Sequence, residues 1–211
     1  MKKAFTMLEL ILVIVIVGIL SFALVNGWER NTLREAADQL VNHIRYTQHL
    51  AMQEDKFDPA ATPANQPWFA SNWQIWVRVF GGDLYYEVFS DQDKNTNSDA
   101  TEEAIDPLSG TRLGNSIAGV GLPDNRNLRL TEKYGIINVA FSPNCAVGAG
   151  GKVAFDSLGR PHGNVSYAAA APYAFHLIAA CNIILTDNQA RAVTITVQPE
   201  TGYTSITAQN Y

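Results

Sequence analysis

The sequence has few charged residues, and acidic and basic side chains nearly balance. Asp, Glu, Lys and Arg make up 17% of its 211 residues, against about 25% in typical domains. The 15 basic and 20 acidic residues leave a formal net charge of −5. Low charge together with 10% aromatic residues excludes a disordered chain. The small excess of acid disfavours a general nucleic-acid-binding surface.

The sequence also lacks the common catalytic signatures. It contains no Gly-x-Ser-x-Gly elbow, no His-Glu-x-x-His motif, no phosphate-binding P-loop and no Gly-x-Gly-x-x-Gly fingerprint. None of its four histidines stands beside a nucleophile motif. We expect surface or interface positions for His43 and His49, which lie six apart and do not share a helix face. The sequence therefore predicts a protein that is not an enzyme.

What the sequence does contain is a dense apolar block near its N-terminus. Residues 5–25 hold one charged residue, Glu9, and follow Lys2 and Lys3. A helix of that length rises about 30 Å, the thickness of a bilayer hydrocarbon core. The block is too long for a cleaved signal peptide and lacks its small-x-small exit. The pattern predicts a membrane span at residues 5–25 with a cytoplasmic N-terminus, and a carboxylate inside such a span usually has a function.

The residues Ala4-Phe5-Thr6-Met7-Leu8-Glu9-Leu10 resemble the class III leader of type IV prepilins and type II secretion pseudopilins. In that family the prepilin peptidase cuts before a Phe, and the new amino group is N-methylated. The resemblance implies a cleaved leader at residues 1–4, with the cut between Ala4 and Phe5. Glu9 is then the fifth residue of the mature chain, and the resemblance implies that it pairs with the Phe5 amino group of a neighbouring subunit. The family usually has Gly where this chain has Ala4.

The helical pattern continues beyond the apolar block. Apolar and small residues recur at helical spacing from Leu33 to Ala51, and three prolines between Lys56 and Pro67 end the pattern. We expect one long helix over residues 5–54, with a soft point at Asn26-Gly27. Its first half faces lipid or a filament, and its second half packs on the globular domain. This arrangement resembles the pilin spine.

After residue 67 the apolar period changes to two. Residues 73–80 and 83–90 alternate on either side of Gly81-Gly82, which predicts a hairpin. Further strands are predicted at residues 127–131, 135–142, 151–156, 173–186, 192–198 and 203–207, with one short helix at 101–105. A break of the 173–186 strand near Ala179-Ala180 stays open. Residues 55–211 are therefore expected to form a periplasmic or extracellular β-rich domain. The predicted fold class is α+β and pilin-like: a long N-terminal helix packed on mostly antiparallel strands.

Three segments resemble the GspH/FimT group of minor pilins: residues 33–56, 153–161 and 181–198. The resemblance implies a structural subunit of a type II secretion pseudopilus or a type IV pilus. Its partners would be other pilin subunits and the prepilin peptidase, and its location a single pass of the bacterial inner membrane. The alternative is a competence-type minor pilin that binds DNA. Such members use basic residues near the C-terminus, whereas residues 198–211 contain no Lys or Arg, so nucleic acid is disfavoured.

One loop has the oxygen-ligand spacing of a calcium site. Side chains with carboxylate or carboxamide oxygens occupy positions 1, 3, 5, 7, 9 and 12 of an EF-hand-type loop: Asp91, Asp93, Asn95, Asn97, Asp99 and Glu102. Thr96 replaces the usual Gly at position 6, and a strand rather than a helix enters the loop. Both a Ca²⁺ site and a solvated acidic turn therefore stay open. Some pseudopilins use a loop calcium to order their β region.

Cys145 and Cys181 are the only cysteines. The exported location implied by the leader resemblance is one where disulfides form. A bridge between the two would stabilise the fold by about 3–4 kcal/mol. Two buried free thiols are the alternative.

Overall fold

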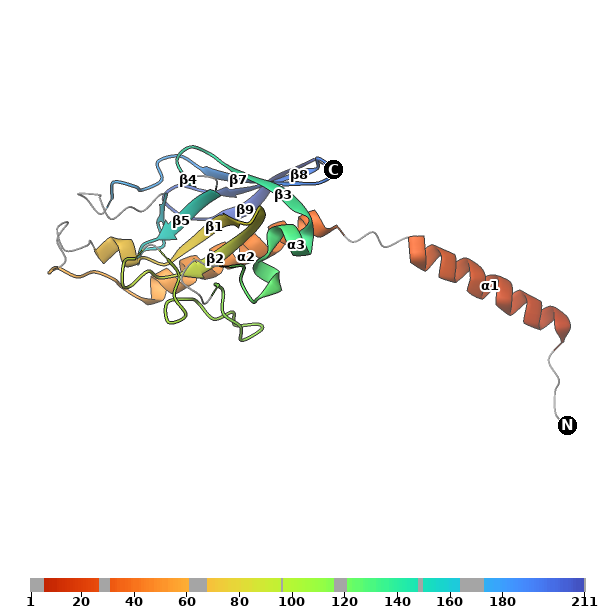
Figure 1. Ribbon diagram of the computed structural model, residues 1–211. Coiled ribbons are helices and arrows are strands. Elements are labelled where there is room, and N and C mark those ends of the chain that lie inside the picture. Colours follow the sequence, from red (N-terminus) through yellow and green to blue (C-terminus); the bar gives the residue numbers. More distant parts are fainter. Residues whose placement is uncertain are drawn as a thin grey trace. The chain divides into compact units, whose positions relative to one another are not determined.

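The computed structural model describes residues 6–26, 31–60, 68–95, 97–115, 121–147, 150–163 and 173–210. The chain divides into two compact units, Met1–Asn31 and Thr32–Tyr211, and each is described here by itself. Helix α1 (Met7–Asn26) belongs to the first unit. The second unit contains helix α2 (Thr32–Gln53) and all the strands found in the described residues (Figure 1).

Helix α1 has no polar face. Its side chains from Met7 to Phe22 are all exposed. Thr6 precedes the helix, and its hydroxyl oxygen accepts a hydrogen bond of 3.3 Å from the backbone N–H of Glu9. Thr6 and Glu9 thus have the Thr-x-x-Glu spacing of a capping box, which satisfies backbone donors at a helix start. Only the backbone N–H of Glu9 takes part in the contact described here.

The predicted single helix over residues 5–54 is wrong. The helical residues form two separate helices, α1 and α2, and residues 27–30 lie outside the described part of the chain. Asn26 and Gly27 have low helix propensity, and Asn31 is of a type favoured directly before a helix start. Helical spacing on both sides of this point therefore does not require one continuous helix. The pilin-like fold class built on a long N-terminal helix is contradicted.

None of the helices in the described residues has the length and apolarity needed to cross a membrane. This finding contradicts the membrane span predicted at residues 5–25 and the predicted single-pass location in the inner membrane. The prediction counted its apolar run from Phe5, which the structure does not describe, whereas α1 begins at Met7.

Helix α2 is amphipathic and packs its apolar face into the core of the second unit. Its apolar stripe is buried in the same hydrophobic cluster as residues of both sheets. Ala36 and Ala37 lie in the stripe and are fully buried, and such small residues allow close packing. On its last turns, the Gln48 side chain donates hydrogen bonds of 2.8 Å to the carbonyls of Gly159 and Thr201. These contacts hold one turn of each sheet against the helix.

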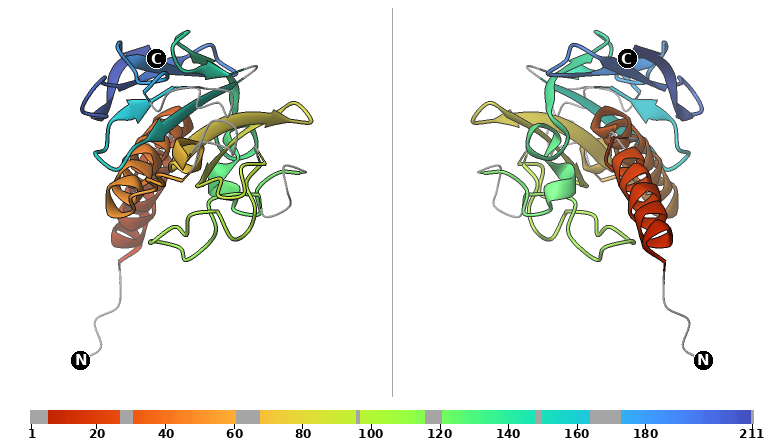
Figure 2. Two further views of the ribbon diagram at one scale, coloured as in Figure 1. Left: turned by 90° about the vertical axis from the view of Figure 1, so that its left-hand side faces the viewer. Right: turned by 90° about the vertical axis from the view of Figure 1, so that its right-hand side faces the viewer.

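The strands form two antiparallel sheets, which Figure 2 shows in two further views. The first sheet has the order β2-β1-β5-β4, and β6 also pairs with β5. The second sheet has the order β3-β7-β8-β9. The strands of the first sheet are β1 (Gln74–Phe80), β2 (Asp83–Phe89), β4 (Ala146–Val147), β5 (Gly150–Phe155) and β6 (Pro161–His162). Those of the second are β3 (Ile136–Phe141), β7 (Cys181–Asp187), β8 (Ala192–Val197) and β9 (Thr204–Asn210).

The predicted hairpin is confirmed, because β1 pairs with β2 around Gly81-Gly82 from Phe80↔Asp83 outwards. The strands predicted at 135–142, 151–156, 192–198 and 203–207 are also present as β3, β5, β8 and β9. The strand predicted at 127–131 is wrong. This segment forms the turn η3 (Arg126–Leu128) and helix α3 (Leu130–Tyr134), which ends at Gly135 in the left-handed conformation (φ 72°).

Two further predictions fail in detail. Of the strand expected at 173–186, only the part after Ala179-Ala180 forms, as β7 from Cys181. The short helix expected at 101–105 is absent, and Glu103 and Ile105 instead form isolated bridges with Phe89 and Arg112. A short helical turn that was not predicted, η2 (Trp68–Ser71), precedes β1.

Candidate functional site

The acidic loop follows β2 directly and brings three carboxylates together. One oxygen from each of Asp91, Asp93 and Glu102 lies within 4.8 Å of the others. Asp91 and Glu102 are buried, and Asp93 is exposed. Three convergent carboxylates form a donor set that suits a hard divalent cation such as Ca²⁺. The spacing seen in the sequence therefore corresponds to a real cluster.

The loop folds around its own carboxylates. Glu102 Oε1 accepts hydrogen bonds from the backbone N–H groups of Gln92 (2.6 Å) and Asp93 (3.0 Å). Asp91 Oδ1 accepts one from the N–H of Asn95 at 3.1 Å. Short polar side chains that accept from backbone amides a few residues later are what bends such segments into turns. The last ligand position, Glu102, thus closes the loop back onto its start.

The other three candidate ligands lie beside the cluster. The Asn95 carboxamide donates to Asp93 Oδ2 (2.8 Å) and Asp99 Oδ2 (3.1 Å), and its oxygen accepts from the N–H of Asn97 (2.7 Å). Asp99 donates its own N–H to Glu102 Oε2 at 3.3 Å. The structure therefore brings Asp91, Asp93 and Glu102 together. Asn95 and Asp99 are one hydrogen bond away, and Asn97 contributes only its backbone to the contacts described.

A charged layer on the first sheet lies close to this loop. Trp76 pairs with Glu87 on one side and with Lys152 on the other, so all three share one face. Arg78 and Lys152 each place their cationic group 4.3 Å from the centroid of the Trp76 ring. Burial raises the pKa of Glu87, although Arg78 at 3.2 Å opposes this shift. Burial lowers the pKa of Lys152 to about 8, against the attraction of Asp91.

Two turns of the second unit hold a carboxylate in another way. Asp156 Oδ1 accepts the N–H groups of Leu158 (3.0 Å) and Arg160 (2.9 Å), and its Oδ2 binds the Arg160 guanidinium (2.8 Å). Asp187 repeats this pattern with Gln189 (3.0 Å) and Arg191 (2.9 Å to N–H, 2.7 Å to guanidinium). We call these segments, residues 156–160 and 187–191, the Asp–Arg turns. Sequence reasoning missed them.

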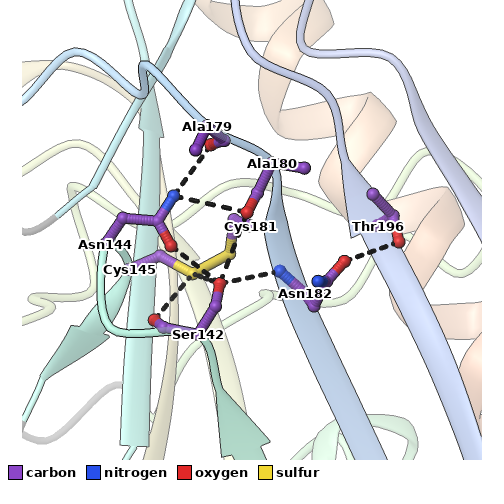
Figure 3. Close-up of a disulfide and its surroundings, with 8 residues drawn as sticks. All are labelled: Ser142, Asn144, Cys145, Ala179, Ala180, Cys181, Asn182 and Thr196. Atoms are coloured by element: carbon purple, nitrogen blue, oxygen red, sulfur yellow. Dashed lines mark hydrogen bonds between the residues drawn. A yellow bond between two sulfur atoms is a disulfide. The ribbon is translucent and has the colours of Figure 1, made fainter.

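The disulfide between Cys145 and Cys181 is present, so the free-thiol alternative is wrong (Figure 3). The two Cα atoms are 5.9 Å apart, and both residues are fully buried. Cys145 immediately precedes β4 of the first sheet, and Cys181 begins β7 of the second. Asn144 supports the bridge by donating to the carbonyl of Ala179 at 2.8 Å. The bond therefore joins the two sheets covalently.

The candidate leader residues are only partly described. Ala4 and Phe5 lie outside the described residues. Glu9 is exposed in the first turn of α1. None of the side-chain contacts found in the described part of the chain involves its carboxylate.

His43 is buried within the second unit, which corrects the predicted surface or interface position, whereas His49 is exposed as expected. His43 Nδ1 lies 2.7 Å from the Tyr86 hydroxyl. Burial lowers the pKa of His43, and Asp106 opposes this shift only in part. His43 forms part of the wall of a hollow of about 260 Å³ between α2 and the turn that follows Asp106. We call this hollow the α2 groove. Its lining is Gln39, Asn42, His43, Tyr46, Asp106, Pro107, Leu108, Ser109 and Asn127.

Comparisons of the chain with protein-family models, with curated proteins and with solved structures found no match. The resemblance to prepilins and pseudopilins therefore rests on the sequence motifs alone.

Proposed function

We propose that the chain is a structural subunit of a type II secretion pseudopilus or a type IV pilus, of the minor pilin or pseudopilin kind. One observation carries the proposal: α1 is apolar on every side, and its side chains from Met7 to Phe22 are exposed. Exposed apolar surface of this extent marks a surface that a partner covers. The leader-like sequence favours α1 of other copies, or of other pilin subunits, as that partner.

Glu9 gives the packing of such helices a register. It is the only acidic residue in the first turn of α1, and no basic residue occupies the last turn. A lone carboxylate among packed apolar helices is costly unless a positive group pairs with it. Cleavage before Phe5 by a prepilin peptidase would create that positive group on each subunit. Pairing Glu9 of one copy with the Phe5 amine of the next then fixes the axial offset between copies.

The test compares two variants of Glu9 in order to separate an effect of its charge from an effect on helix capping. Glu9→Gln keeps a side chain that suits a capping box but removes the charge, and Glu9→Ala removes both. We expect mass spectrometry to find Phe5 as the mature N-terminus in both variants. We also expect the sheared filament fraction of producing cells to contain neither variant. Glu35→Gln, the same change in the first turn of α2, is the matched control and should assemble normally.

Two outcomes would contradict the proposal. If Glu9→Gln assembles like the wild type while Glu9→Ala does not, Glu9 acts as a cap and the charge pairing is wrong. If the wild-type chain keeps residues 1–4 and never enters a filament fraction, the subunit function itself is wrong.

We also propose that the acidic loop binds Ca²⁺, which would order the segment after β2. Support comes from the convergence of Asp91, Asp93 and Glu102 and from the oxygen-only donor set. Titration of the purified full-length chain with CaCl₂ should release or absorb heat and raise its melting temperature, because a cation that binds only the folded state stabilises it. Asp93→Asn should abolish both effects, and Asp124→Asn, an exposed acid elsewhere, should leave them intact. Absence of any effect of millimolar Ca²⁺ on the wild type would overturn the proposal.

A further inference from the structure

An exposed aromatic patch lies beyond the end of α2. We call it the tip patch and define it as Phe57, Trp68, Leu158, Arg160 and Tyr173, which line a hollow of about 280 Å³. Leu158, Phe57 and Tyr173 are 71%, 61% and 60% exposed. These residues come from four separate described segments of the chain, so the fold gathers them at one place. Apolar side chains gathered at the surface mark an interaction site more often than scattered ones do.

The contacts within the tip patch resemble those of a binding surface. The Trp68 ring packs edge-on against Phe57, with centroids 5.5 Å apart. The Arg160 guanidinium lies 5.0 Å from the centroid of the Tyr173 ring. Tyr, Trp, Phe and Arg are the residue types enriched where binding energy concentrates. Asp55 and Asp58 are exposed on either side of Phe57, so this apolar side chain has an acidic border.

The α2 groove is suited to receive such a side chain. Tyr46, Pro107 and Leu108 supply apolar wall, and Leu108 is 95% exposed beside the opening. The buried His43 has a lowered pKa, so its imidazole adds no positive charge to the wall near pH 7. The Asp106 carboxylate is already occupied, since it accepts from the Leu108 N–H (3.0 Å) and from the Ser109 hydroxyl (2.6 Å). One large apolar side chain can therefore enter without breaking these hydrogen bonds.

The border of the groove has the opposite sign to that of the tip patch. Asn127 lines both the groove and a neighbouring hollow, whose other walls are Arg126, Glu132 and Lys133. Arg126 is 76% exposed at its side chain, and Arg129 stands next to this group. Three cations face two carboxylates, those of Glu132 and of Glu35, which lies 3.9 Å from Lys133, so the border keeps a net charge of +1. Asp55 and Asp58 would meet this border if Phe57 entered the groove.

We propose that the tip patch of one copy docks into the α2 groove of the next copy, with Phe57 in the groove and Asp55 and Asp58 facing Arg126 and Lys133. Phe57 of one copy cannot enter the α2 groove of the same copy, because the groove flanks the middle of α2 and Phe57 follows the end of that helix. Figure 1 shows α2 running through the second unit away from α3. A patch and a pocket at different places on one molecule form a head-to-tail contact, which propagates into an open filament. This inference rests on the proposed filament function and names the surface by which its globular parts would meet.

The test uses two introduced cysteines in the full-length chain, Ala60→Cys beside the tip patch and Asn42→Cys at the groove. Both positions are exposed, and filaments from producing cells would be oxidised with diamide and run on non-reducing gels. A chain with both changes should give a ladder of cross-linked multimers. Each single variant alone should give none, and a mixture of the two should stop at dimers. Only a head-to-tail contact produces this combination.

Matched variants in the double-cysteine chain test the named residues. Phe57→Ala should reduce the ladder at least tenfold, whereas Phe80→Ala, another exposed phenylalanine, should leave it unchanged. Asp55→Lys with Asp58→Lys should also weaken it, and Arg126→Glu with Lys133→Glu should restore it. A melting curve of each variant confirms that the fold is intact.

The failures are distinguishable. Dimers from Ala60→Cys alone would show a tip-to-tip contact, and a product of another mass would show a different partner; either result overturns the head-to-tail inference. Filaments that contain the chain but give no cross-link overturn the inference and leave the subunit function standing. A chain that stays monomeric and outside any filament overturns both.

Discussion

The acidic loop and the Asp–Arg turns both contain aspartates, but different groups contact the carboxylates in the two places. In each Asp–Arg turn, an arginine four positions after the aspartate neutralises it in place. In the acidic loop, the contacts described for Asp93 and Glu102 come only from backbone and carboxamide N–H groups. Amides satisfy hydrogen bonding but leave the negative charge. Each turn therefore carries its own counter-charge, whereas Asp93 and Glu102 show none among the described contacts, and a bound cation would supply it.

The two Asp–Arg turns also differ from each other. Each connects two antiparallel strands and places one residue in the left-handed conformation, Gly159 (φ 77°) in the first and Ala190 (φ 60°) in the second. Glycine adopts this conformation without strain, whereas alanine does so at a cost of about 1 kcal/mol. Asp156 has an additional contact with His162 at 3.3 Å, for which Asp187 shows no counterpart among the described contacts. The first turn is therefore expected to be the more stabilising of the two.

The largest effect is expected from removing the carboxylate of an Asp–Arg turn. Asp156→Ala leaves two backbone N–H groups, an arginine and a histidine without their acceptor, and it should lower the free energy of unfolding by about 3 kcal/mol. Asp187→Ala should cost about 2 kcal/mol, since no histidine is involved. Urea denaturation of the full-length chain measures both values. Equal losses would show that the His162 contact contributes nothing.

Acid should remove the same stabilisation in the wild type. Burial alone would raise the pKa of Asp156, but hydrogen bonds from His162 and Arg160 outweigh it and lower the pKa to about 2. A carboxyl group with a lowered pKa stabilises the fold above its unfolded pKa of about 4. That contribution is lost as the pH falls from about 4 to about 2. The urea midpoints of the wild type and Asp156→Asn should therefore converge over this range, and a constant gap would refute the assignment.

Removal of Ca²⁺ should change hydrogen exchange in the acidic loop but not in the Asp–Arg turns. If the loop holds Ca²⁺, adding EDTA should speed hydrogen exchange at the amides of Gln92, Asp93 and Asp99 by about tenfold or more, which corresponds to about 1.4 kcal/mol. The amides of Arg160 and Arg191, whose acceptors need no cation, should not change. Nuclear magnetic resonance of the full-length chain reports each amide separately. Equal changes at both places would show that EDTA acts on the whole fold.

The smallest effects are expected at the left-handed positions. Gly159→Ala should destabilise by about 1 kcal/mol through backbone strain, and its new Cβ would also lie 3.0 Å from the Met52 sulfur. Ala190→Gly should change stability by only a few tenths of a kcal/mol, because relief of strain is offset by the entropy of glycine in the unfolded chain. Thermal unfolding of both variants checks the contrast. A loss at Ala190→Gly as large as that at Gly159→Ala would contradict the strain argument.

Local patterns predicted the strands better than they predicted the helices. The hairpin of β1 and β2 was predictable because alternation and a Gly-Gly turn are both local. Residues 127–131 alternate in the same way, yet they form a turn and α3, since Gly135 terminates a short helix that five residues of pattern cannot distinguish from a strand. At Asn26-Gly27 we predicted a soft point rather than a helix end, because helical spacing continues in the sequence on both sides of it.

The candidate site was predictable only where it lies within one segment. Asp91, Asp93 and Glu102 belong to a single loop, so their spacing was enough to predict that they meet. Lys152 and Glu87 join the charged layer through strand register with Trp76, which depends on how β5 finds β1. The tip patch likewise combines four separate segments. The Asp–Arg turns could have been found from the repeated Asp-x-x-x-Arg spacing between two strand patterns.

The disulfide also determines how the second unit would respond to tension. A pull between Thr32 and Asn210 would follow the backbone to Cys145, cross the sulfur bridge and continue from Cys181. The 36-residue separation between the two cysteines includes β4, β5 and β6, and these strands would lie outside the path of the force. Their contour length of about 120 Å would stay hidden until the bridge is reduced. Under load, β5, which pairs with β1, β4 and β6 in the first sheet, is thereby protected from stretching.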